Sequence, residues 1–218
     1  MVRWKSKPSG RIGDNMKKIL GLVALILLIV LSCFYFFPKQ PKNIFDEIYQ
    51  ETEKTYRTNN ILRHIDGVKI SPGWPSDDPN ISYTPFGKYE TLPKGYSDIT
   101  IELNFGKGIK GVLILFERKT NSNITLWYSA HYNMQKKVLK KKLAIFEEPR
   151  QPGQFIDDEE KVREYLRKNN ISKEELEKDY DEIVNQKVLK DWFSIYDSKY
   201  SPSNYGEVKV ETQWENWW

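Results

Sequence analysis

The sequence is poor in the residues on which most catalytic and metal sites depend. Its one cysteine is Cys33, so residues 38–218 can form no disulfide, no thiol nucleophile and no cysteine-based metal site. Only two histidines are present, and we interpret both His64 and His131 as hydrogen-bonded structural residues. Zincin, serine-hydrolase, P-loop and dinucleotide-binding motifs are all missing. We therefore expect no enzyme, no cofactor and no metal.

Excess positive charge is confined to the amino end of the chain. Six basic residues and one acidic residue lie in 1–38, out of 34 basic and 30 acidic residues in total. Residues 39–218 thus hold 28 basic and 29 acidic residues, and their net charge is close to zero. This balance removes the main electrostatic reason to expect nucleic-acid binding.

Residues 19–37 form an uncharged apolar run of nineteen residues. As a helix it would be about 28 Å long, close to the ~30 Å hydrocarbon core of a bilayer. Because basic residues precede it, we expect a cytoplasmic tail at 1–18, a transmembrane anchor at 19–37 and one extracellular domain at 38–218. Met16-Lys17-Lys18 could itself begin this export leader.

The outer end of the run, LSCFYFF, allows three interpretations. A cleaved signal would need small residues at the cleavage site, and 34–37 supply none. The aromatic cluster favours the interfacial end of an uncleaved helix. Lipid attachment at Cys33 stays open as the alternative, and it would tether the domain on the same side.

Four segments with strand patterns follow one another through short connections. They span 98–105, 111–119, 124–132 and 136–146. Strands joined by short turns pair antiparallel, so we expect a four-stranded meander. Residues 207–214 alternate as a last strand, and 67–70 is a candidate short strand within the irregular stretch 61–85.

Helical patterns lie on both sides of the meander in the sequence. Asn43 can cap a helix whose apolar face holds Ile44, Phe45, Ile48 and Tyr49. Residues 157–169 and a long stripe that begins with the capping box Ser172–Glu175 predict further helices. The expected fold class is α+β, an antiparallel meander sheet with helices packed mainly on one face, preceded by one N-terminal transmembrane helix.

If helices cover one face of the sheet, the other face is free to dock a partner. Alternation places Thr100, Glu102 and Asn104 there, together with one of the neighbours Trp127 and Tyr128. The last meander strand is rich in lysine, which either protects an edge strand from aggregation or forms a basic patch for an acidic partner. The candidate binding residues are Thr100, Glu102, Asn104, Trp127, Tyr128, Lys136, Lys140 and Lys142.

Two other interpretations use different residues. Acidic loop residues, among them Asp77, Asp78, Glu147 and Glu148, could serve a cell-wall hydrolase, although a solvated acidic surface is the simpler explanation. The terminal residues Trp214, Trp217 and Trp218 could instead pack in the core, form an interface or stack on sugars in a carbohydrate-binding module.

Four stretches of the sequence form a recognisable set: the apolar leader 16–37, PKNIFDEIY at 41–49, LRHIDGV at 62–68 and ITLWY at 124–128. Together they resemble the TipC-type immunity proteins of Gram-positive bacteria such as streptococci. The resemblance covers residues 16–218 and includes no catalytic signature. It implies a non-enzymatic protein that binds and neutralises a cognate LXG-type toxin. Such toxins are exported by the type VII pathway and attack the cell-wall precursor lipid II.

Overall fold

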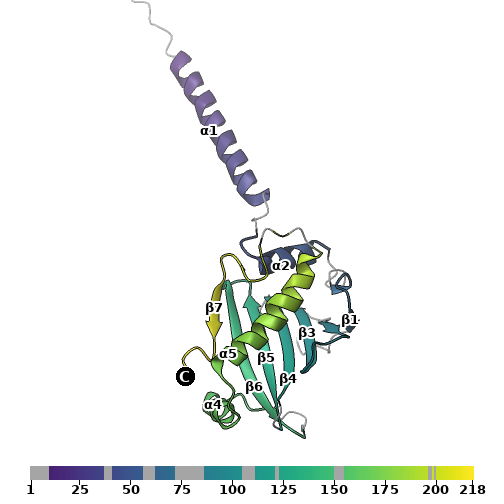
Figure 1. The fold of residues 1–218 in the computed structure, drawn as a ribbon. Coiled ribbons are helices and arrows are strands. Elements are labelled where there is room, and N and C mark those ends of the chain that lie inside the picture. The colour runs from purple at the N-terminus through teal and green to yellow at the C-terminus, as the bar shows by residue number, and fades with distance from the viewer. Residues whose placement is uncertain are drawn as a thin grey trace, which may run out of the picture. The chain divides into compact units, whose positions relative to one another are not determined.

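The computed structural model describes residues 10–36, 41–55, 62–71, 86–104, 111–120, 123–149, 155–195, 198 and 200–218. By its internal contacts the chain forms two compact units, Met1–Gln40 and Pro41–Trp218. The first unit contains helix α1 (Gly10–Phe36), and the other helices and strands belong to the second (Figure 1). The expected start of the domain at residue 38 stays a prediction.

Helix α1 corrects the sequence-based expectation of a membrane anchor. The helix begins well before the apolar run, so that Arg11, Asp14, Lys17 and Lys18 lie within it. Among the described residues, no helix has the length and apolar character needed to cross a bilayer. This finding contradicts the predicted transmembrane helix at 19–37 and the predicted single-pass localisation with an extracellular C-terminal domain.

The second unit is built on a seven-stranded sheet whose strands lie in sequence order. The strands are β1 (Val68–Ser71), β2 (Phe86–Tyr89), β3 (Tyr96–Asn104), β4 (Gly111–Lys119), β5 (Ile124–Asn133), β6 (Val138–Glu147) and β7 (Lys209–Thr212). Neighbours from β1 to β6 pair antiparallel, and β7 pairs parallel with β6. The predicted meander corresponds to β3–β6 within this larger, mixed sheet. Because β7 pairs along 138–141, the lysine-rich strand is not an edge strand there, and the edge-protection interpretation is wrong.

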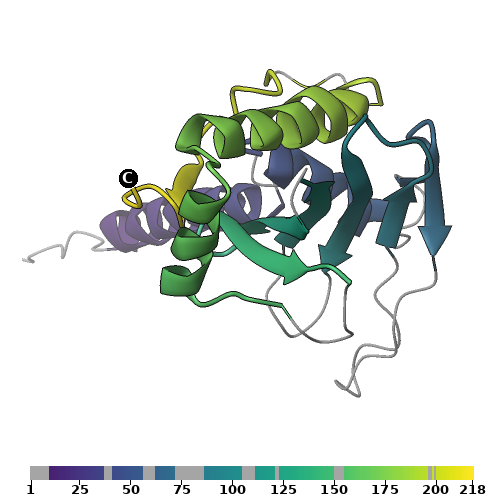
Figure 2. The same ribbon diagram turned by 60° about the horizontal axis from the view of Figure 1, so that its bottom comes forward.

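The helices of this unit confirm the α+β class. They are α2 (Ile44–Thr55), α4 (Glu159–Lys168), α5 (Lys173–Tyr180), the π-helical segment η1 (Asp181–Leu189) and α6 (Lys190–Phe193). Figure 2 shows the continuous helix from α5 to α6 lying across one face of the sheet. Helix α2 packs on the same face, where the ring of Phe45 stacks on Tyr132 of β5 at 4.7 Å between centroids.

Local signals in the sequence explain both long helices. The amide of Asp46 donates to the Asn43 side chain at 2.9 Å, which is the predicted cap of α2. From α5 to α6 the buried side chains Leu176, Tyr180, Val184, Val188 and Trp192 recur every four residues. That spacing exceeds the α-helical period of 3.6, and a π-helix takes more residues per turn because its bonds join i and i+5. The π-helical segment therefore keeps the stripe facing the sheet.

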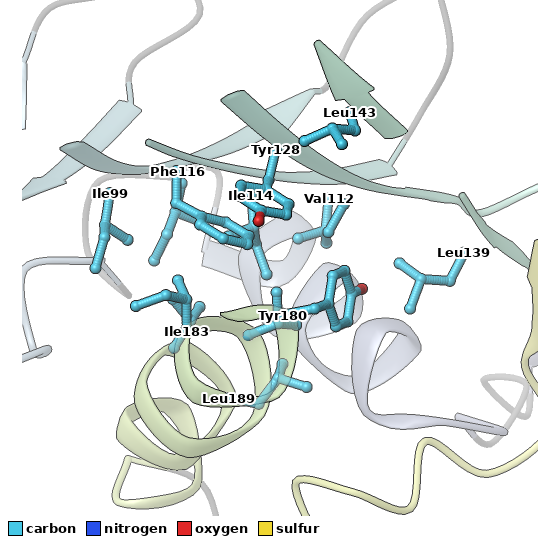
Figure 3. Close-up of a cluster of buried hydrophobic side chains, with 14 of the residues drawn as sticks. Ile99, Val112, Ile114, Phe116, Tyr128, Leu139, Leu143, Tyr180, Ile183 and Leu189 are labelled. Atoms are coloured by element: carbon cyan, nitrogen blue, oxygen red, sulfur yellow. The ribbon is translucent and has the colours of Figure 1, made fainter. Parts of the chain in front are cut away.

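The core lies between this helical layer and the sheet. Side chains from β4 and β5 point toward those of the long helix, as Figure 3 shows for Phe116, Tyr128 and Ile183. Phe116 and Tyr128 are cross-strand partners whose rings stack at 4.4 Å, and both are fully buried. Such pairs add to the stability gained from area burial alone.

Beside these rings, a buried polar cluster connects the sheet to the long helix. It consists of Tyr96, Arg118, Tyr128, Glu175 and Asp179. The hydroxyls of Tyr128 and Tyr96 donate to Asp179, the latter at 3.2 Å. Arg118 contacts Asp179 through Nε at 2.6 Å and Glu175 through Nη2 at 2.7 Å. Glu175 is the last residue of the predicted capping box. Its backbone amide donates to the Ser172 hydroxyl as predicted, and its carboxylate bonds Arg118.

Candidate functional site

The sheet face opposite the long helix is the candidate site, and we call it the open face because the long helix does not cover it. It is only partly accessible, since Thr125, Ser129, Ala144 and Phe146 on this face are buried. Strand register fixes its membership, because Tyr128 and Phe116 point toward the helix and their neighbours along each strand point away. One row of the open face crosses six strands. From β2 to β7 it reads Phe86, Glu102, Leu113, His131, Lys140 and Glu211.

Three zones of different chemistry follow one another across this face. Acidic side chains lie on β3 and β4, among them Glu102 and Glu117. Half-buried Leu113, Leu115 and Trp127 form an apolar centre on β4 and β5. Basic side chains follow on β6, where Lys140 and Lys142 are exposed. An apolar centre flanked by charges of opposite sign is an arrangement that suits a protein partner with the complementary order of charges.

The two lysines of the basic zone differ in their surroundings. Lys140 forms an ion pair with Glu211 at 3.5 Å across the β6–β7 pairing. Lys142 has no ion-pair partner among the described residues. It is therefore the cation of this zone whose charge is left to act on a partner.

Two titratable groups of the open face are partly desolvated. Burial raises the pKa of Glu102, whose carboxyl is half-buried beside Leu113. Burial lowers the pKa of His131, and the positive charges of Lys142 and Lys140 lower it further. The Nε2 atom of His131 is buried and finds no hydrogen-bond partner among the described residues. The interpretation of His131 as a hydrogen-bonded structural residue is therefore wrong for this atom.

The structure resolves the choice between Trp127 and Tyr128. Trp127 lies on the open face, half-buried, with its ring 6.4 Å from that of Phe155. Tyr128 is fully buried on the opposite face, where its hydroxyl bonds Asp179, so it is not accessible to a partner.

The other candidate residues fall in several places. Thr100, Lys140 and Lys142 lie on the open face, although Thr100 is only 9% exposed. Lys136 is exposed in the turn before β6 rather than on a strand. Asn104 pairs with Gly111, and its side chain lies outside the described part. Cys33 lies in α1, and its side chain is likewise outside the described part.

The structure also locates the residues on which the hydrolase and carbohydrate-binding interpretations depend. Trp214 and Trp217 are buried in the core, whereas Trp218 is 56% exposed. Glu147 and Glu148 accept hydrogen bonds from Tyr165 and Thr125, and Asp77 and Asp78 lie outside the described residues. Within the part of the chain that the structure describes, no group of three or more His, Cys, Asp or Glu side chains could hold a metal ion.

Sequence reasoning missed the apolar part of the open face. Leu113 and Leu115 belong to a strand that is apolar on both faces, and this pattern predicted only a central position. Phe155 is half exposed, and it reaches this face because Ile156 forms a β-bridge with Ile145 beside β6. The alternation of side chains along β4 could have placed the two leucines on the open face. No local sequence pattern indicated that Phe155 would lie there.

The sequence matches the TipC immunity protein-like family over residues 17–213. The fold is similar to the structure of TipC2 from Streptococcus intermedius B196, with a TM-score of 0.75 and 41% sequence identity. That match covers 82% of this chain and 100% of the other. No curated protein sequence matches significantly.

Proposed function

Since the chain belongs to the TipC immunity protein-like family, we propose that it binds and neutralises a cognate protein toxin through the open face. The family indicates an immunity function and a non-enzymatic role. The open face supports the binding part of the proposal, because it combines half-buried apolar side chains with charges of both signs. The proposal extends to the toxin that the sequence resemblance implies, an LXG-type protein exported by the type VII pathway and acting on lipid II.

We choose this surface because of the row of side chains that runs across the sheet from Phe86 to Glu211. Its apolar centre at Leu113 is bounded by Glu102 on one side and by Lys140 on the other. Interfaces commonly have a desolvated apolar centre inside a polar rim, and aromatic side chains contribute much of the binding energy. Trp127 is the aromatic side chain placed to act in this way.

The function is tested by expressing the chain together with an LXG-type toxin from the same organism. We expect growth to be rescued and the two proteins to co-purify. Toxicity that persists with the chain present, together with the lack of a complex, would refute the proposed function.

The surface is tested separately by reversing charge. The double variant Lys140→Glu/Lys142→Glu should weaken the complex by about tenfold or more, because close charge pairs at interfaces contribute on the order of 1.5 kcal/mol or more. The matched control is Lys178→Glu/Lys190→Glu, which changes net charge equally at exposed positions on the long helix. Equal affinity of both double variants for the toxin would remove the basic zone from the interface, even with the complex itself established.

A further inference from the structure

A second polar site lies at the end of β4. It is a cleft of about 440 Å³ between that strand end and the connection from α4 to α5. Its lining includes residues Arg118, Lys119, Lys168, Asn170 and Glu175. The cleft therefore gathers three cations and one carboxylate from three separate segments of the chain.

The charge left unbalanced in the cleft belongs to two lysines. Arg118 is engaged by Glu175 at 2.7 Å and by Asp179 at 2.6 Å, so its charge is balanced and its fork is occupied. Glu175, the acidic residue of the lining, is the partner of Arg118 in this ion pair. Lys119 and Lys168 are both exposed, and neither has an ion-pair partner among the described residues. Two positively charged residues thus belong to the lining of one cleft, and within the described part of the chain neither is paired with a carboxylate.

The donors of the cleft select one kind of anion. Carboxylates are best recognised by the planar fork of arginine, and the arginine here is already occupied. Lysine acts as a compact point charge with three donors, and it is a common ligand of phosphate. Asn170 adds an amide at the rim, where its backbone has a left-handed φ of 54° after the last turn of α4. Among the described residues the side-chain amide of Asn170 has no hydrogen-bond partner.

We propose that this cleft binds a phosphate group through Lys119 and Lys168, with the Asn170 side chain as a further donor. The phosphate can be inorganic or carried on a larger molecule. Of the cleft residues, Lys119 lies at the end of β4 on the side of the open face, as Glu117 does. The proposal uses neither Lys140 nor Lys142, on which the test of the toxin-binding surface depends, so either proposal can fail alone.

The test measures binding of inorganic phosphate to the full chain by phosphorus NMR at low ionic strength, where screening is weak. We expect the double variant Lys119→Ala/Lys168→Ala to bind phosphate at least about tenfold more weakly than the wild type. The control Lys178→Ala/Lys190→Ala removes the same charge from exposed positions outside the cleft and should change the affinity by less than about twofold. Thermal unfolding of each variant verifies that it is folded.

Three results would overturn the proposal. The wild type shows no saturable phosphate binding, or the control variant loses as much affinity as the cleft variant, which would indicate a diffuse field of surface charge. The third is acetate binding as tightly as phosphate in a parallel titration at equal ionic strength. To separate phosphate carried on a lipid from free phosphate, the same variants are tested for sedimentation with vesicles containing phosphatidic acid. Vesicle binding lost only in the cleft variant would assign the site to a phosphate carried on lipid.

Discussion

Replacing Asp179 with alanine should reduce the stability of the fold by more than the loss of an exposed ion pair would. Asp179 is 5% exposed and accepts hydrogen bonds from two tyrosine hydroxyls while it contacts Arg118 at 2.6 Å. Its removal leaves the buried Tyr128 hydroxyl without its acceptor and the Nε of Arg118 without its carboxylate contact, while Tyr96 keeps only a longer bond to Glu182 at 3.4 Å. Breaking a buried pair in this way costs about 3–5 kcal/mol.

Two features of the buried polar cluster place the loss at the lower end of that range. Arg118 keeps Glu175 as a partner, and the arginine side chain is 18% exposed, so water can reach part of it. Burial also raises the pKa of Asp179, although Tyr128, Arg118 and Tyr96 act in the opposite direction. The contacts therefore do not fully offset the desolvation of the carboxylate, and we expect a loss of about 3 kcal/mol.

Urea unfolding followed by circular dichroism measures this loss. With a slope of about 2 kcal/mol per molar urea, the midpoint should fall by about 1.5 M. The control is Glu215→Ala, which removes the exposed partner of Lys173 at 3.1 Å and should cost less than about 1 kcal/mol. If Asp179→Ala unfolds within about 0.5 kcal/mol of the wild type, the reasoning that the cluster fastens the helix to the sheet is refuted.

Two further predictions concern single positions of the sheet. Gly111→Ala would place a Cβ 2.0 Å from the Tyr132 carbonyl oxygen, and backbone cannot yield there, so we expect a loss of about 3 kcal/mol in urea unfolding. Gly87→Ala, whose nearest atom at 2.8 Å is a side-chain methyl group, should cost clearly less; equal costs would contradict the argument. Because the folded pKa of His131 is lowered, its contribution to stability is present above about pH 6.5 and is lost as the pH falls through the folded pKa. His131→Gln should therefore lose less stability than the wild type between about pH 7 and pH 5, and parallel losses would count against a desolvated imidazole.

The parts of the fold that depend on local pattern were predicted from the sequence. Asn43 caps α2, and the meander strands lie within a few residues of their predicted bounds, because capping and alternation act over neighbouring residues. The parallel pairing of β7 with β6 was not predicted, since it joins residues about seventy positions apart and depends on how the helices return the chain to the sheet. Strand β2 is only four residues long and contains a glycine, so it carried little strand signal.

The sequence predicted that one face of the sheet would be the candidate site, but not which side chains of each strand would lie on that face. Alternation separates Trp127 from Tyr128, yet only packing decides which of the two is covered. Tyr128 is drawn to the helical side because its ring stacks on Phe116 and its hydroxyl finds Asp179. That choice then fixes, strand by strand through the register, which side of every neighbouring strand is open.

The same contacts that bury Tyr128 also fix the backbone of the open face, the surface proposed to bind the toxin. The sheet is fastened to its helices by stacked rings and by the buried polar cluster, all on the covered side. Cross-strand register then holds Glu102, Leu113 and Lys140 at fixed spacings without using their own side chains. A binder whose contact residues are already ordered loses less conformational entropy on association. Under the proposed function, stability and recognition would thus depend on opposite faces of one sheet, so that the exposed residues of the open face could vary with the partner.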